Sequence, residues 1–388
     1  MTLQSIHSLP ENITTTRPKR IIRNPDDMEA VMPEIHDRID ASRKAIAKGH
    51  PFAVAGEYLQ NVIGMPADLN DPLLSVILPD ESDIATDNDV GHLVSIENRR
   101  VTKSPAITQK YIGSVIMTVT SVCHQRCTHC FRKNVNDTIS VLSDEAINQA
   151  FEDLDSIGGD NIFDIIMSGG EPLTVKPALI EKIALQRDQL NRKRGLRGVP
   201  PIHFSINTRE PVVMPSTILN NPEMIEAIRH LNPLVISIQI LHPREITHGF
   251  VDVMRIFRGM GIGLRTNHPI LKGVNDDPNV LREMYTKLAE HGVFPKDLIH
   301  PIKSGIPREK CVTLERSMEI MRELVKRLPG TLLPRLQCCT PNLGKSFIDP
   351  FHMKKDGTFG YDMENGEIIG LRTKDGEKNQ PASAMGKT

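Results

Sequence analysis

Long apolar runs, an excess of one charge and a regular set of cysteines are all missing from this sequence. No apolar stretch approaches the roughly 20 residues that a membrane-spanning helix needs. The first residues, MTLQSIHSLPENITTT, lack the charged and apolar regions of a secretion signal. The 47 Lys and Arg residues nearly balance the 48 Asp and Glu residues, so no overall field attracts nucleic acid or an anionic membrane. We therefore predict a cytoplasmic protein without a nucleic-acid or membrane partner.

Cysteine is scarce, yet half of it is concentrated in one place. The six cysteines of the 388 residues do not resemble the disulfide framework of a secreted protein. Three of them, Cys123, Cys127 and Cys130, fall within eight positions, whereas the other three have no recognisable ligand spacing. In a reducing compartment, such a cluster indicates metal or redox chemistry.

The first part of the chain differs in pattern from the rest. Apolar residues at helical spacing predict one helix over residues 26–49, ended by Gly49, and the Pro- and Asp-rich passage after it predicts an irregular connection. The chain is long enough for one large domain with appendages, or for two domains. We interpret residues 1–105 as a helical and irregular accessory region.

A regular alternation of strand and helix patterns follows over residues 106–330. Strand-like runs occupy residues 114–120, 161–169, 202–207, 233–240, 262–270 and 297–302. Helical patterns lie near residues 142–156, 176–193, 222–231, 248–260, 278–291 and 314–328. Six such units in a row imply an α/β fold with a parallel sheet. Residues 331–388 form a C-terminal segment that ends in a disordered tail.

Motifs at the strand ends distinguish an open doubly wound sheet from a full or partial barrel. The cysteines follow the first run, SGGEP the second, NTRE the third and LHP the fourth. Barrels carry their sites on the loops at the C-terminal ends of the strands, so a barrel would place all four motifs around one mouth. We therefore predict a partial (β/α)6 barrel with an N-terminal helical extension and a C-terminal segment.

The C-x3-C-x2-C spacing offers three soft ligands and no fourth. A structural zinc site needs four, so zinc would have to recruit His124, His129 or a distant group. An iron–sulfur cluster held by three thiolates leaves one iron open to bind something else. Phe131 after the last cysteine, in place of histidine, argues against covalent haem attachment. A zinc-binding module without catalysis and buried thiols without a ligand are the alternatives.

With His129 directly before the last cysteine and GGEP after the second strand, the pattern resembles the radical S-adenosylmethionine (radical SAM) superfamily. The resemblance implies a [4Fe–4S] cluster on the three cysteines, whose open iron holds S-adenosylmethionine and whose electron releases a 5′-deoxyadenosyl radical. The two glycines would let a strand edge approach the methionine ammonium, and the glutamate would complete a polar pocket. The nucleotide-binding residues that it implies are His129, Ser168, Gly169, Gly170, Glu171 and Asn207.

From about residue 105 to 350 the chain further resembles the lysine 2,3-aminomutase family. The matching stretches, in this order, are CHQRCTHCFRK, MSGGEPL, NTREPVVMP, HPREIT, LKGVNDD and PNLGKS. The resemblance implies conversion of an α-amino acid to a β-amino acid, with pyridoxal 5′-phosphate as a further cofactor. It also implies an electron donor such as flavodoxin or ferredoxin, and a homo-oligomer. A radical SAM enzyme of another reaction type, without pyridoxal phosphate, is the alternative.

The same resemblance assigns cofactor residues outside the cysteine motif. Lys345 matches the catalytic lysine that binds the cofactor covalently, a reaction open to a buried lysine because it can lose its proton. The alternative is a lysine in a surface turn. The resemblance also implies cofactor contacts for Lys110, Tyr111, Asn267 and Gln239.

The substrate residues depart from the lysine-specific pattern. Arg132 matches the position that clamps the substrate α-carboxylate. Lysine-specific members bring two aspartates to the terminal ammonium, but the corresponding stretches here, LIHPIKSG and RLQCCTP, contain no carboxylate. Because an ammonium buried without a counter-charge costs several kcal/mol, we do not expect lysine as the substrate. Lys303, in place of the first aspartate, either suits an anionic substrate such as glutamate or points to solvent. We predict no zinc site.

Overall fold

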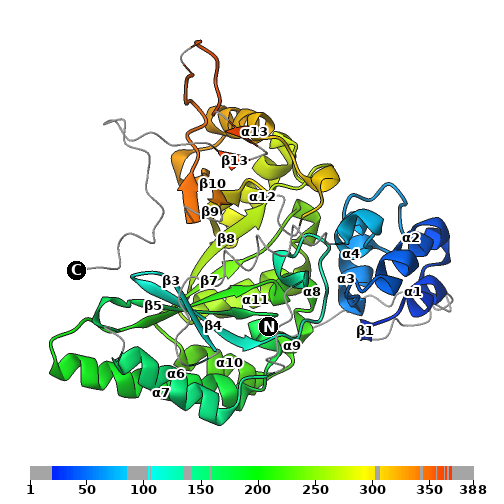
Figure 1. Cartoon of the computed structure of the whole chain (residues 1–388). Helices are drawn as coiled ribbons and strands as arrows, with labels where there is room; N and C mark the ends of the chain where they lie inside the picture. The colour runs from blue at the N-terminus through cyan, green and yellow to red at the C-terminus, as the bar shows by residue number, and fades with distance from the viewer. Residues whose placement is uncertain are drawn as a thin grey trace, which may run out of the picture.

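The computed structural model of the protein is shown in Figure 1. It describes residues 20–84, 104, 106–134, 141–156, 159–301, 306–340, 344–354, 356–361, 363–364 and 367–368. None of the described helices is both long and apolar enough to cross a membrane.

A nine-stranded sheet forms the centre of the molecule (Figure 1). Its hydrogen-bonded order is β11-β10-β9-β8-β7-β6-β5-β4-β3. Strands β4 to β10 run parallel to their neighbours, and the two edge strands β3 and β11 are antiparallel. The strands are β3 (Ile107–Tyr111), β4 (Ser114–Thr120), β5 (Asp164–Gly169), β6 (His203–Thr208), β7 (Leu234–Ile238), β8 (Gly263–Pro269), β9 (Phe294–Ile299), β10 (Arg335–Thr340) and β11 (Gly344–Phe347).

Helices cover one face of this sheet. Phe204 of β6 lies under Arg187 of α7, with the guanidinium 4.8 Å from the ring centre. His268 of β8 contacts the hydroxyl of Tyr285 of α12 at 3.0 Å. The helices that follow the strands are α6 (Asp144–Ser156), α7 (Pro177–Leu196), α8 (Glu210–Val213), α9 (Ser216–Leu219), α10 (Pro222–His230), α11 (His248–Gly259), α12 (Pro278–Glu290) and α13 (Leu314–Arg327).

The opposite face, here called the inner face, carries a set of polar residues. Partners in the register of paired strands point to the same side, and successive residues of one strand point to opposite sides. The register therefore places one row of residues away from the helices: Asp164, Ser205, Asn207, Ser237, Arg265, Asn267, Asp297 and Arg335. Two contacts support this arrangement, Ser205 to Asp164 at 2.7 Å and Arg265 to Ser237 at 2.8 Å.

The predicted α/β partial barrel is confirmed, with additions at its edges. All six predicted strands are present as β4 to β9, and the last begins earlier than expected, at Phe294. The sequence patterns missed β3, β10 and β11. The described strands form a linear order without hydrogen-bonded pairing between the two edges, so the barrel is open.

The N-terminal region differs from its prediction. One helix over residues 26–49 is wrong, because the chain forms α1 (Pro25–Val31) and α2 (His36–Ala47) separated by a turn. Pro33 explains the break: proline disfavours the helical conformation at the residue before it, and Met32 has φ −137° and ψ 72°. The predicted irregular connection also contains helix α4 (Leu74–Ile77) and the short turn Glu81–Asp83. Strands β1 (Ile21–Ile22) and β2 (Val54–Ala55), helix α3 (Gly56–Tyr58) and the helical turn Leu59–Ile63 also belong to this region.

Arg187 joins two helices, and its replacement tests this packing. The buried guanidinium donates to the carbonyls of His230 at 3.1 Å, Leu231 at 3.2 Å and Asn232 at 3.3 Å, which lie at the end of α10 and just after it. Arg187→Met keeps the apolar stem but leaves these carbonyls without a donor, so we expect a loss of about 1–3 kcal/mol in the free energy of unfolding by urea. Lys193→Met on the same helix removes an exposed ion pair with Asp155 and should cost less than about 1 kcal/mol. Equal losses in the two variants would contradict this role.

Candidate active site

Cys123, Cys127 and Cys130 lie together in the loop that follows β4. The N–H of Cys130 donates to the carbonyl of Cys127 at 3.1 Å, so the end of the motif forms a tight turn. Burial raises the pKa of Cys127 to about 11, and it also raises the pKa of Cys123. Thiols in this environment keep their protons until a cation compensates the thiolate charge. The loop is therefore suited to hold a positively charged metal group.

The spacing of possible metal ligands distinguishes a site for a single metal ion from a site for a multi-iron cluster. Among the described residues, no three His, Cys, Asp or Glu side chains gather closely enough to hold a single metal ion. Each thiolate of a four-iron cluster binds a different iron, so such thiolates stand farther apart than the ligands of one ion. A multi-iron cluster therefore needs less convergence of Cys123, Cys127 and Cys130 than a single ion does.

The SGGEP glycines hold the end of β5 against the start of this loop. The N–H of Gly170 donates to the carbonyl of Thr120 at 2.6 Å. A Cβ at Gly169 would lie 2.4 Å from the Thr120 oxygen, and one at Gly170 would lie 2.4 Å from the Val122 oxygen. Gly169 also has φ +121°, a conformation that favours glycine. The sequence interpretation missed this packing role, while an approach of the same glycines to methionine stays a prediction.

Glu171 is the centre of a buried polar network at the ends of β5 and β6. It accepts hydrogen bonds from the Thr208 hydroxyl at 2.6 Å and from the Arg209 N–H at 2.8 Å. Burial, followed by the nearby carboxylate of Glu210, raises the pKa of Glu171 to about 7. Glu210 in turn contacts Nδ1 of His124 at 2.6 Å, which ties the cysteine loop to the end of β6. The sequence analysis assigned no role to Glu210, although it stands in the NTRE motif.

His129 is buried beside positive charge. Burial, and then the charges of Arg209 and Lys133, hold its pKa well below the usual range. Its Nδ1 has no hydrogen-bond partner within the described residues. Arg209 itself pairs with Glu245, which also accepts from the Tyr58 hydroxyl at 2.6 Å. A buried polar atom without a partner fits a bound polar ligand, because leaving it unpaired costs free energy.

The other residues expected around the nucleotide and the pyridoxal phosphate lie along the carboxyl ends of successive strands. Asn207 and Asn267 belong to the inner face, and Ser168, the second-last residue of β5, lies on the same side. Gln239 directly follows β7, where its N–H donates to the carbonyl of Thr208 at 2.9 Å. The buried Oδ1 of Asn267 has no partner in the described part of the chain. Like Nδ1 of His129, this atom would gain a partner from a bound polar group.

Tyr111 and Lys345 meet although they lie on opposite edges of the sheet. The backbone N–H of Lys345, on β11, donates to the hydroxyl oxygen of Tyr111, on β3, at 2.9 Å. The register of both edge strands places the two residues on the inner face. The side chain of Lys345 is exposed, because among the described strands its edge strand β11 pairs with β10 alone. Lys110 lies next to Tyr111 in β3, and its side chain is outside the described residues.

The expected substrate residues are only partly described. Arg132 is half-buried in the short turn Phe131–Asn134, directly after the cysteine loop, whereas Lys303 lies outside the described residues. The sequence analysis missed Asp297, a buried carboxylate of β9. Its oxygens contact Arg335 at 3.0 Å and Lys296 at 2.8 Å, so two cations already compensate it. The sequence could have shown this carboxylate, because Asp297 directly precedes the stretch LIHPIKSG that was searched for one.

Comparison with known families agrees with this geometry. Residues 117–284 match the family model of the radical SAM superfamily, so this part of the chain is similar to radical SAM domains. That similarity implies a four-iron cluster and S-adenosylmethionine as cofactors. A solved radical SAM methyltransferase from Sphaerobacter thermophilus is 15% identical, with a TM-score of 0.44 over 61% of this chain and 69% of that chain.

More particularly, the chain is similar to amino-acid 2,3-aminomutases. It is 28% identical over 331 residues to a protein of Aquifex aeolicus (strain VF5) named provisionally as an L-lysine 2,3-aminomutase, covering 82% of this chain and 84% of that protein. It is 23% identical over 337 residues to the glutamate 2,3-aminomutase of Clostridioides difficile (strain 630), covering 86% of this chain and 74% of the relative. The resemblance found in the sequence motifs is thereby confirmed.

Proposed function

We propose that the protein is a radical SAM amino-acid 2,3-aminomutase that uses pyridoxal 5′-phosphate and converts an α-amino acid to a β-amino acid. The observation that carries this proposal is the contact of Tyr111 with Lys345. These residues are 234 positions apart, and both occupy positions that hold pyridoxal phosphate in the resembling family. Their contact at the open edge of the barrel supports a pyridoxal phosphate site there.

The residues present fit the cofactors that this function requires. Cys123, Cys127 and Cys130 would hold the cluster, whose fourth iron is left for the nucleotide. The orphaned Nδ1 of His129 and Oδ1 of Asn267 would gain partners from bound groups. When bound, the cluster and nucleotide supply a carbon radical that removes hydrogen from Cβ, and the pyridoxal ring stabilises the migrating amino group.

The chain itself has to orient the substrate and exclude water. Arg132 follows the cysteine loop and would form a bidentate pair with the substrate α-carboxylate, as the family resemblance implies. The buried network of Glu171 and Glu210 anchors the loop that carries it, through His124. Holding Cβ at the radical source replaces a random encounter by a fixed geometry, which is the main contribution of a protein to radical chemistry.

The charge around the substrate end favours an anionic amino acid, with glutamate as our proposed substrate. The two stretches without aspartates lie on adjacent strands, where the N–H of His300 donates to the carbonyl of Gln337 at 2.7 Å. Asp297, the described carboxylate on these strands, is compensated by Lys296 and Arg335, so it has no charge to spare for an ammonium. Lys303 would add a further cation.

An anaerobic assay with a panel of amino acids tests the function. The protein is incubated with S-adenosylmethionine, pyridoxal phosphate and dithionite, and 5′-deoxyadenosine and β-amino products are measured with glutamate and with lysine. We expect β-glutamate and at least about tenfold less product from lysine, since the lysine ammonium would be buried without a counter-charge. Product from lysine and none from glutamate would overturn the assignment of glutamate as the substrate. Deoxyadenosine without any β-amino product, with or without pyridoxal phosphate, would instead support another radical SAM reaction.

A further inference from the structure

The N-terminal region is bonded directly to the backbone of the cysteine loop. The N–H of Arg126 donates to the carbonyl of Ala53 at 2.8 Å, and the N–H of Thr128 donates to the carbonyl of Val76 at 3.0 Å. The hydroxyl of Thr128 also donates to the carbonyl of Ser75 at 2.7 Å. Both loop residues stand between motif cysteines, so the region expected to be an accessory holds the middle of the loop in place.

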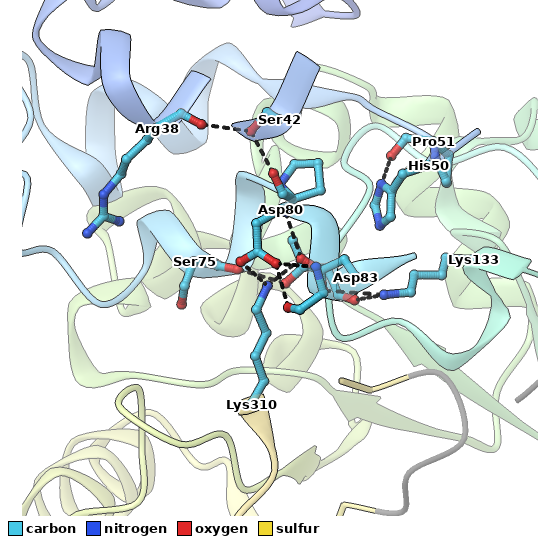
Figure 2. Close-up of polar contacts among 12 residues, drawn as sticks. Arg38, Ser42, His50, Pro51, Ser75, Asp80, Asp83, Lys133 and Lys310 are labelled. Carbon is cyan, nitrogen blue, oxygen red and sulfur yellow. Dashed lines mark hydrogen bonds and ion pairs between the residues drawn. The ribbon is translucent and has the colours of Figure 1, made fainter. Parts of the chain in front are cut away.

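Asp83, at the end of this region, joins two further segments (Figure 2). Lys133, three residues after the last motif cysteine, places its Nζ 3.4 Å from one carboxylate oxygen of Asp83 and 2.6 Å from the carbonyl of Thr128. Lys310, on the segment between β9 and α13, contacts the other oxygen. Figure 2 shows the two lysines reaching Asp83 from different sides. A single carboxylate therefore connects three parts of the chain.

Burial makes the charge of Asp83 indispensable. The side chain of Asp83 is 0% exposed and that of Lys133 is 2% exposed, and Lys310 is 16% exposed. Asp80 lies farther from Lys310, at 3.6 Å, and is half-exposed. Without the Asp83 charge, two cations would remain in a region where water cannot solvate them, and removing one partner of a buried pair is strongly destabilising. Lys133 stands three residues after Cys130, so this pair lies close to the expected cluster.

We propose that Asp83 is a positioning residue for the radical SAM centre: through Lys133 it holds the cysteine loop, and through Lys310 the segment after β9, in a fixed relation to each other. The N-terminal region is then a working part of the active site. This role requires only the cluster and the nucleotide of the proposed function. It stands or falls independently of the amino-acid substrate, because its readouts include no aminomutase product.

The test compares Asp83→Asn, Lys133→Met and the double variant in anaerobically reconstituted protein. Cutting the Asp83 to Lys133 link loosens the loop, so all three should bind S-adenosylmethionine about tenfold or more weakly, as measured by the change in the electron paramagnetic resonance of the reduced cluster. The midpoint potential should respond to charge alone. Asp83→Asn adds net positive charge and should raise it, Lys133→Met removes positive charge and should lower it, and the double variant should return near the wild-type value.

A merely structural role gives a different pattern. It would lower the melting temperature and leave the affinity and the potential at their wild-type values, and this result would overturn the proposal. If Asp83→Asn fails to fold, Lys133→Met alone tests the proposal. This variant still contains the ion pair of Asp83 with Lys310, so no buried charge is left uncompensated. The control is Glu81→Gln, which removes an exposed carboxylate of the same turn that pairs with Lys48 at 3.0 Å. If Glu81→Gln shifted the midpoint potential as much as Asp83→Asn, the positioning role of Asp83 would also be overturned.

Discussion

Cys127→Ser, reconstituted anaerobically with iron and sulfide, is expected to lose the brown four-iron chromophore and to cleave S-adenosylmethionine about 100-fold more slowly or worse. Changes in residues that merely support metal ligands already cost about 10- to 100-fold, and a lost ligand costs more. Serine is a poor substitute because its hydroxyl keeps its proton and is a harder ligand than a thiolate. Two thiolates would remain for four irons, which is too few to retain the cluster. Iron content, visible absorbance and 5′-deoxyadenosine formation measure the loss.

A matched variant separates this ligand role from a general need for cysteine. Cys311→Ser changes a half-buried thiol outside the motif and should keep both the chromophore and the nucleotide cleavage. An undiminished chromophore in Cys127→Ser, or an equal loss in Cys311→Ser, would show that the centre is not the one that the motif implies. Because this pair needs no amino-acid substrate, it tests the radical SAM centre by itself.

Lys345→Arg is expected to lower β-amino acid formation by about 10³-fold or more while leaving the cluster intact. Arginine keeps the positive charge and the strand, but it does not become the neutral amine that bonds covalently to the cofactor aldehyde. Loss of a residue that bonds covalently in the reaction usually costs several powers of ten. The measurements are product formation and the mass of the peptide that retains the cofactor after borohydride treatment.

Lys296 provides the control for this experiment. It lies on β9 near Lys345, and burial, together with the charges of Arg265 and Lys345, lowers its pKa although Asp297 opposes the shift. It is thus a second lysine near Lys345, and its amine loses a proton more easily than that of an ordinary lysine. In the wild-type protein, we expect borohydride to trap the cofactor on the peptide that contains Lys345. The Lys296→Arg variant should retain the same bond between Lys345 and the cofactor. Recovery of the cofactor on the Lys296 peptide would show that Lys296, on β9, is the catalytic lysine. Recovery on neither lysine peptide would show that the function does not use pyridoxal phosphate.

Local features of the chain could be predicted because their causes are local. The helices after the strands have hydrophobic spacing and, in several cases, side-chain caps close to their starts, such as Asn221 before α10 and Thr313 before α13. The break at Pro33 has an equally local cause and could have been predicted from proline alone. The edge strands β3 and β11, and β10 beside β11, were missed, since what stabilises such a strand is the neighbour that it pairs with.

The sequence by itself determined the alternation of strands and helices, the three cysteines and the motifs at the strand ends, because each depends on residues within a few positions of one another. Only the tertiary structure decided that Tyr111 meets Lys345, that Asp83 joins Lys133 to Lys310, and that Asp297 is already compensated. These contacts connect segments tens to hundreds of residues apart or depend on which charges are buried together. The first and the third follow from the register and curvature of the sheet, and the second from the packing of the N-terminal region on the cysteine loop, which no short stretch of sequence contains.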